Sequence, residues 1–320
     1  MLRLVLLGLL AGLFFSSTFV LNELMASQGG HWFWSASGRY LFAWLILSSI
    51  ILIKGGMSEF VALVRLLHSY WRFWVLAGGI GFGGFYSLLC FGADHAPGWL
   101  IATAFQFTSV ASLIILTAFG EKLGKQVITT SLLIFTGTLV ASFGEGVLDN
   151  GTSLAQVLLL GGLPALIAGF CLPIGNQLVW YATAKPNGDN ALLRTMPHIS
   201  SALMGSALNK VWLLTTGSLP FWLVLGIITA PTAPSTMQMF HTFLVALLSG
   251  MIATCIFIFA RSKASTGGQI AAIDATQASE MIFAIIGGMV LLGSPLPSAV
   301  SLIGVLMVMA GLICFASMQS

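Results

Sequence analysis

The sequence predicts an all-α integral membrane protein whose ten transmembrane helices form two inverted five-helix repeats. Three observations carry this prediction. Only 7% of the 320 residues are charged and 58% are hydrophobic, which leaves too little polar surface to coat a soluble globule. Apolar runs of about 20 residues, the length that crosses a hydrocarbon core, recur along the whole chain. Segments of the first half also resemble segments of the second half.

Hydrophobic runs between polar breaks predict five helices in each half of the chain. In the first half, residues 1–150, we expect them near 4–23, 32–53, 72–92, 98–119 and 126–143. In the second half, residues 151–320, we expect them near 156–181, 196–218 or beyond, 239–260, 267–292 and 297–316. The first run follows Arg3 but lacks a small-residue cleavage site, so we interpret it as a permanent helix and not as a secretory signal.

The seventh run is the least regular of the ten. Its apolar character continues to Ala230, but prolines interrupt it at Pro220, Pro231 and Pro234. Because proline removes a backbone donor, we expect this helix to end near Ser218, followed by an interfacial stretch. The alternative to ten crossings is that one apolar run forms a re-entrant hairpin.

The basic residues predict the orientation of the chain in the membrane. If the N-terminus faces the cytoplasm, the inner connections hold ten Lys and Arg residues and the outer connections hold none, as the positive-inside rule requires. The ten are Arg3, Lys54, Arg65, Arg72, Lys122, Lys125, Lys185, Arg194, Arg261 and Lys263. The acids on or beside the outer side are Glu23, Asp94, Glu145 and Asp149. We therefore expect a multi-pass protein of the plasma (inner) membrane with both termini cytoplasmic, and the net charge of +3 needs no nucleic acid to explain it.

Two pairs of segments indicate an internal repeat. LLAGLFFSSTFVLNEL, starting at Leu9, resembles LIAGFCLPIGNQLVW, starting at Leu166. IATAFQFTSVASLI, starting at Ile101, resembles IAAIDATQASEMI, starting at Ile270. Because five is an odd number, the second half must be upside down relative to the first, which is the plan of many secondary transporters that bind substrate near the bilayer midplane.

Several short motifs carry a family resemblance over nearly the whole chain. ASGRYLF at the start of the second helix and FGEKL at the end of the fourth resemble the drug/metabolite transporter superfamily. LPFWLVLG, SGMIATCIFIFARSKA and IAAIDATQASEMIFAIIGGMVLLGSPLP are similar to its multidrug-resistance efflux transporter branch. The resemblance implies a ten-helix exporter or exchanger with cytoplasmic termini and a central cavity lined by both halves, and it implies no particular substrate.

The sequence also departs from the pattern of the family that it resembles at two places. The small four-helix exporters of the superfamily use a membrane glutamate in their first helix, whereas the first helix here has an acid only at its outer end, Glu23. Gly293-Ser294 stands where the second half would repeat Gly120-Glu121. The mechanism of the small exporters therefore does not transfer directly.

Charged residues inside the apolar runs are the main functional candidates, because each costs at least about 2.5–3.5 kcal/mol at a helix centre. They are Arg39, Lys210, Asp274 and Glu280. Glu280 follows Gly267 by 13 residues and Lys210 follows Pro197 by 13, so both are expected about 20 Å deep. Either they face a cavity, where Glu280 binds a cationic substrate or a coupling proton, or they form a buried ion pair that locks two helices.

Asp274 precedes Glu280 by six residues, which turns it about 120° around the helix. We expect it to meet Arg261 or Lys263 near the cytoplasmic boundary, although without a nearby cation it could cycle a proton. Gln277 lies three residues from each acid and could hydrogen-bond to either.

Arg39 lies about two turns inside the second helix from its outer end. A tether to Glu23 or Asp94 is favoured over binding of a substrate carboxylate. Gln106 and Asn209 are neutral candidates for lining the cavity, although amides also bind neighbouring helices together.

We expect no cofactor and no metal. Gly79, Gly81 and Gly84 match a nucleotide-binding pattern, but they lie in an apolar run with no preceding strand, so we interpret them as allowing close helix approach or bending. No metal-ligand spacing, nucleophile elbow or P-loop is present in the sequence, and the four cysteines are widely spaced within apolar segments.

The sequence therefore favours a secondary transporter over an enzyme. We expect it to export a small metabolite or lipophilic cation by alternating access, with protons as the candidate exchange ion. The alternative is an amino-acid or metabolite facilitator or exchanger without proton coupling. An intramembrane enzyme or a non-transporting receptor is less favoured. The expected partners are a small-molecule substrate and the lipid bilayer, with the chain as a monomer or homodimer.

Overall fold

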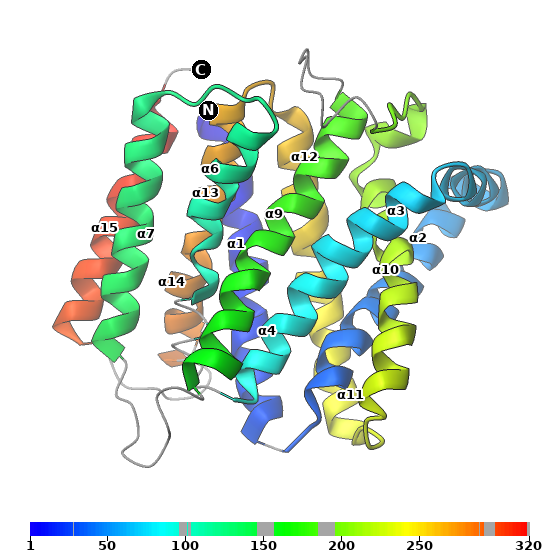
Figure 1. Cartoon of the computed structure of the whole chain (residues 1–320), viewed down its shortest axis with the longest axis horizontal. Coiled ribbons are helices and arrows are strands. Elements are labelled where there is room, and N and C mark those ends of the chain that lie inside the picture. The colour runs from blue at the N-terminus through cyan, green and yellow to red at the C-terminus, as the bar shows by residue number, and fades with distance from the viewer. Residues whose placement is uncertain are drawn as a thin grey trace.

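The computed structural model describes residues 1–27, 29–95, 101, 104–145, 157–184, 196–287, 289–290 and 298–318. In these ranges the chain is a bundle of helices without strands (Figure 1). Among these residues, eight helices are long and apolar enough to cross a membrane, and two shorter apolar helices, Thr108–Ala118 and Lys125–Ala141, accompany them. The predicted all-α membrane class is confirmed. Asp149, Lys185, Arg194, Gly293 and Ser294 lie outside the described residues, as do the side chains of Glu23 and Glu145.

Most elements lie close to the predicted apolar runs, and α2 and α10 are the exceptions. The first half contains α1 (Leu2–Ser27), α2 (Trp32–Ser69), α3 (Trp71–Gly78), the π-helical η1 (Gly79–Gly84), α4 (Phe85–Ala93), α6 (Thr108–Ala118) and α7 (Lys125–Glu145). The second half contains η2 (Val157–Gly162), α9 (Leu163–Ala184), η4 (Ala202–Gly205), α10 (Ala207–Thr229), α11 (Thr236–Val245), η5 (Ala246–Ala253), α12 (Thr254–Lys263), α13 (Gly267–Ala275), η6 (Thr276–Ala278), α14 (Ser279–Gly287) and α15 (Ala299–Ser317).

α2 is longer than the predicted 32–53 because a second helical stretch follows it without a loop. Gly56 has φ 69° and ψ −176°, a conformation that glycine adopts without a steric penalty, and it bends the chain between the two stretches. The predicted bounds therefore describe the part of α2 before the bend.

The expectation for the seventh helix was wrong at both ends. Ser201 and Ser206 accept hydrogen bonds from the backbone N–H groups of Leu203 and Asn209, so these serines cap the short η4 and then α10. α10 therefore begins at Ala207, not near residue 196, and it continues through Pro220 to Thr229. Membrane helices tolerate an internal proline when neighbouring groups meet the freed backbone.

The two halves pack against each other in matching ways. α1 lies against α11, η5 and α12 and against α13 and α14, whereas α9 lies against α3, η1 and α4 and against α6. α2 packs on α10, and α7 pairs with α15 at one edge of the bundle (Figure 1). The first helix of each half thus contacts the third and fourth helices of the other half.

Glycines allow the closest of these approaches. A Cβ atom built on Gly81 in η1 would lie 2.8 Å from the Cα of Gly175 in α9. Gly78, at the end of α3, lies against the α10 backbone at Leu214. The predicted role in close helix packing is thus confirmed for Gly81, whereas nothing lies within 4 Å of a Cβ built on Gly79.

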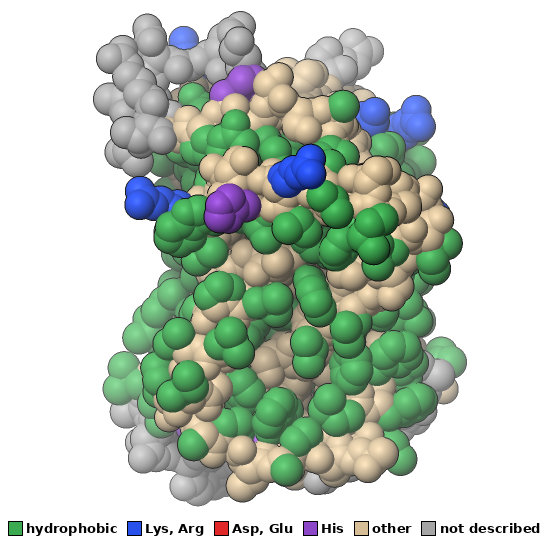
Figure 2. Space-filling view, turned by 90° about the vertical axis from the view of Figure 1, so that its right-hand side faces the viewer, with side chains coloured by type: hydrophobic (Ala, Val, Ile, Leu, Met, Phe, Trp, Pro, Cys, Tyr) green, Lys and Arg blue, Asp and Glu red, His purple; other side chains and the backbone are tan. Residues whose placement is uncertain are grey.

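Charge and apolar surface are separated along the bundle. Both termini lie at one end (Figure 1), and the Lys and Arg side chains on the face shown in Figure 2 gather toward that end. Large apolar side chains are exposed elsewhere, including Ile53 at 83% and Ile227 at 82%. Exposure of this kind fits a surface in contact with lipid, and the protein is an integral membrane protein.

Candidate functional site

A narrow cavity lies in the centre of the bundle and is lined by both halves of the chain. We call it the central cavity; its free volume is about 40 Å³. Its polar and charged lining residues are Thr18, Arg39, Asn176, Ser249, Thr254, Gln277 and Glu280. Its aromatic lining residues are Phe15, Tyr40, Phe82, Phe85, Tyr86, Phe105 and Phe257. One water needs about 10–15 Å³ of such free volume. The cavity therefore has room for about three waters and not for an organic solute.

Arg39 is the basic residue of the central cavity. Its side chain is 4% exposed, and its Nη2 donates to Ser249 Oγ at 2.8 Å. The guanidinium carbon lies 4.3 Å from the ring centroid of Tyr86, a cation–π contact. Its Nε has no hydrogen-bond partner in the described part of the chain.

The expected outer tether of Arg39 through Asp94 is not present. Asp94 lies at the C-terminal end of α4, where burial raises the pKa of its carboxyl and the nearby His95 and His31 oppose that shift. Arg39 points instead into the bundle, where Ser249 and Tyr86 hold it. It is therefore a cavity residue.

Glu280 is the acidic residue of the central cavity. It lies in the first turn of α14, directly after the 3₁₀ segment η6, and is 6% exposed. Among the described residues, no hydrogen bond or ion pair is made to its carboxylate, and the Arg39 guanidinium is the opposite charge that acts on it. A buried carboxylate without a donor is costly, so the site favours neutralisation by a proton or a cation.

Lys210 does not meet Glu280, which corrects the expected pairing. Lys210 is the fourth residue of α10 and lines a different cavity, with His198 and Lys263. The predicted depth of Lys210 assumed that its helix starts near Pro197. The serine caps instead start α10 ten residues later, at Ala207. The lysine therefore lies near the end of the helix and not at mid-depth.

Asp274 is held in a buried polar network. It forms an ion pair with Arg261 and accepts a hydrogen bond from the hydroxyl of Ser112. Arg261 Nη2 also donates to Gln177 Oε1 at 2.9 Å. The network joins α6, α9, α12 and α13, and it contains the contact with Arg261 that the sequence led us to expect.

The three candidate amides have different surroundings. Gln277 is buried and lines the central cavity. Gln106 is buried outside that cavity, and neither its Oε1 nor its Nε2 has a partner among the described residues. Asn209 Nδ2 donates to Glu59 Oε1 at 3.0 Å and to the Leu203 carbonyl at 3.1 Å, so it links α10 to α2 and to η4.

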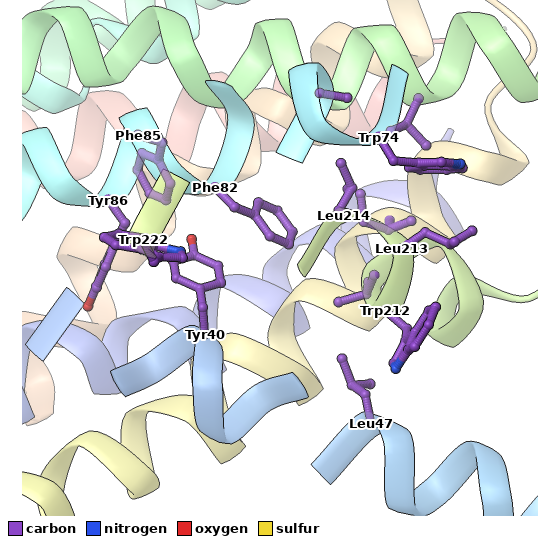
Figure 3. Packing of buried hydrophobic residues seen from close by; sticks show 14 of the residues in the cluster. Tyr40, Leu47, Trp74, Phe82, Phe85, Tyr86, Trp212, Leu213, Leu214 and Trp222 are labelled. Carbon is purple, nitrogen blue, oxygen red and sulfur yellow. The ribbon is translucent and has the colours of Figure 1, made fainter. Parts of the chain in front are cut away.

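Sequence reasoning missed most of the aromatic wall and Asn176. Tyr40 stacks on Phe82 and on Trp222, with ring centroids 5.1 and 5.4 Å apart, and its edge meets Tyr86 (Figure 3). Tyr40 and Asn176 could have been recognised in the sequence, because each places a polar group, a phenol or an amide, within an apolar run. In the described part of the chain, no group of His, Cys, Asp and Glu residues could hold a metal ion.

One family model matches nearly the whole chain, and two curated proteins are similar in sequence. A family model described as "EmrE: Putative multidrug resistance efflux transporter" matches residues 2–320. The "Uncharacterized protein YjlA" of Bacillus subtilis (strain 168) is 34% identical over 96% of this chain and 92% of its own. A 42.1 kDa protein of Shouchella clausii, encoded in the intracellular alkaline protease 3′ region, is 32% identical over 81% of this chain and 64% of its own.

One solved structure has the same overall fold. It is described only as "Crystal structure of protein" and superimposes with a TM-score of 0.69 over 98% of this chain and 96% of its own. Its sequence is 16% identical, so the likeness concerns the fold alone.

Proposed function

The chain belongs to this EmrE-type family of efflux transporters in the drug/metabolite transporter superfamily, and we propose that it exports a small metabolite or lipophilic cation by alternating access in exchange for protons. Membership establishes a membrane transporter. The cargo, the proton coupling and the orientation, with both termini cytoplasmic in the plasma membrane, are part of the proposal.

The observation that carries the proposal is Glu280 in the central cavity. A carboxylate buried between the two halves, without a hydrogen-bond donor, costs at least about 2.5–3.5 kcal/mol near a helix centre. A proton or a cationic substrate would relieve that cost in turn. Aromatic walls such as those of Tyr40 and Phe82 also suit an organic cation.

The packing supports ten crossings arranged as two inverted repeats. α1 and α9 contact equivalent partners in the opposite half, and α7 pairs with α15. The third helix of each half contains a π-helical stretch, η1 in one and η5 in the other. The fourth helix of each half is interrupted, by a turn at Gln106 and Phe107 and by η6. Discontinuous helices at equivalent positions commonly mark the binding site of such transporters.

The small volume of the central cavity supports alternating access. A space of about 40 Å³ cannot hold an organic solute, so the helices must separate before substrate enters. Opening at one face at a time would follow from movement of one half against the other around Glu280.

Arg39 supports a second candidate function. Its guanidinium has a free Nε and shares the central cavity with Glu280. The two opposite charges could bind the carboxylate and the ammonium of an amino acid. That arrangement favours an amino-acid exchanger without proton coupling.

Transport currents test the proposal. Purified protein in proteoliposomes is placed on a solid-supported membrane, and tetraphenylphosphonium and a panel of amino acids are applied under an imposed pH gradient. We expect currents that depend on the gradient and disappear in Glu280→Gln, while Glu121→Gln, outside the central cavity, retains them. Unchanged transport by folded Glu280→Gln would refute the coupling role. Exchange of radiolabelled amino acid against internal amino acid, without a current, independent of the gradient and lost in Arg39→Gln, would favour the exchanger.

A further inference from the structure

A second cavity lies at the end of the bundle where α10 begins and α12 ends. We call it the basic cavity; its volume is about 420 Å³, within the range of small-ligand pockets. Its polar lining includes Thr183, His198, Ser200, Ser201, Lys210 and Lys263. None of its described lining residues is acidic. It shares no lining residue with the central cavity.

We propose that the basic cavity binds a phosphate group, carried either by an anionic lipid or by a soluble solute. The central observation is the ammonium group of Lys210. The side chain is only 6% exposed, yet in the described part of the chain no acceptor or acid contacts its Nζ. Arg261 is buried to a similar degree but has Asp274 as its partner.

A second cation increases the need for an anion. Lys263, the last residue of α12, lines the same cavity and repels Lys210 electrostatically. Two like charges around a partly enclosed space raise its positive potential, and a bound anion neutralises both at once. Lysine binds phosphate well as a point charge with three donors.

The surrounding backbone and hydroxyl groups complete an anion site. α10 is 23 residues long and begins beside the cavity, so the positive end of its dipole adds to the charge of Lys210. The hydroxyls of Ser200 and Ser201 line the same wall and can donate to phosphate oxygens. Phosphate presents enough acceptors to use several of these donors together.

The location decides which phosphates can reach the site. The basic cavity lies where α10 begins and α12 ends. The Lys and Arg side chains of the face shown in Figure 2 gather toward the same end of the bundle. A lipid headgroup and a dissolved phosphate ester can both approach there. Both present a phosphate group to Lys210, so an experiment must distinguish the lipid headgroup from the dissolved phosphate ester.

Binding is measured on the full-length protein in detergent with two probes. The first is inorganic phosphate, titrated at constant ionic strength against chloride while the melting temperature is recorded. The second is phosphatidylglycerol, compared with phosphatidylcholine by native mass spectrometry. We expect phosphate, phosphatidylglycerol or both to bind the wild type. An effect confined to the lipid assigns the site to a headgroup, and an effect of both probes assigns it to the phosphate group itself.

Substitutions identify the site. Lys210→Gln should weaken binding at least about tenfold, because it removes a charged donor. Lys210→Arg should retain binding, and so should Lys54→Gln, which removes an exposed lysine outside the cavity. Equal binding by Lys210→Gln and Lys54→Gln would overturn the proposal, as would failure of the wild type to bind either probe. If Lys210→Gln does not fold, Lys263→Gln replaces it, since Lys263 is exposed and should show the same direction of change.

Discussion

Asp274 and Glu280 lie six residues apart and are buried to nearly the same degree, at 5% and 6% exposure, but their surroundings differ. Asp274 has Arg261 and Ser112 as partners. Glu280 faces the central cavity without a hydrogen-bond donor among the described residues. The comparison teaches that burial of an acid does not by itself mark a functional site. The lack of a hydrogen-bond donor at Glu280 is the more informative feature, because its carboxylate is then available to bind a ligand.

Removing the charge of Asp274 should have the largest effect. Asp274→Asn leaves Arg261 buried without its counter-ion, so we expect the free energy of unfolding to fall by about 3–5 kcal/mol. Thermal and denaturant unfolding of the purified protein in detergent measures this. The double variant Arg261→Gln/Asp274→Asn should recover part of the loss, and equal losses in the single and double variants would contradict the buried pair.

The same chemical change at Glu280 should have the opposite sign. Glu280→Gln removes a carboxylate that has no hydrogen-bond donor, and Arg39, which loses the attraction of that carboxylate, keeps Ser249 and Tyr86 as partners. We therefore expect no large loss of stability and a gain of at most about 2.5–3.5 kcal/mol. The same unfolding assay tests it beside Asp274→Asn. A loss as large as that of Asp274→Asn would show that Glu280 has a structural partner and would remove the contrast.

Ser112→Ala should produce a smaller loss in the paired region. It removes one hydrogen bond to the Asp274 carboxylate but leaves the ion pair, so we expect a loss of about 1.5–3 kcal/mol. Ser112→Cys, which has a weaker donor of similar size, is the control. Its free energy of unfolding should lie between those of the wild type and Ser112→Ala. An unchanged unfolding curve for Ser112→Ala would mean that Arg261 alone stabilises Asp274.

The smallest expected effect is the coupling between Glu280 and Lys210. The two residues line different cavities and share no partner, so their single effects on stability should add within about 0.3–0.5 kcal/mol in Glu280→Gln/Lys210→Gln. A double-mutant cycle measures this. A coupling above about 1 kcal/mol would restore the direct pair that the sequence suggested.

Much of the fold could be predicted because lipid imposes it. A helix must be apolar over the thickness of the bilayer, so the runs near 72–92 and 126–143 predicted α3–η1–α4 and α7 within a few residues. The contact of Asp274 with Arg261 was also predictable, because a short turn after α12 brings both residues to the same end of the bundle.

The rest depended on local caps and on distant packing. The apolar run from Met196 hid the serine caps that delay α10, and this error placed Lys210 too deep. Arg39 and Glu280 come from helices far apart in the chain, and no spacing rule brings them together. Only the packing of one half against the other placed them around one cavity.

The π-helical stretch η1 also determines which side chains reach the central cavity. A π-turn accommodates one more residue than an α-turn, so the helix beyond it is offset by about 100° from an uninterrupted α-helix. Phe85 and Tyr86 follow η1 directly and line the cavity. A homologue one residue shorter within residues 79–84 would present a different set of side chains to Arg39. A change in the length of this stretch would thus alter the lining of the central cavity without a substitution at any residue that lines it now.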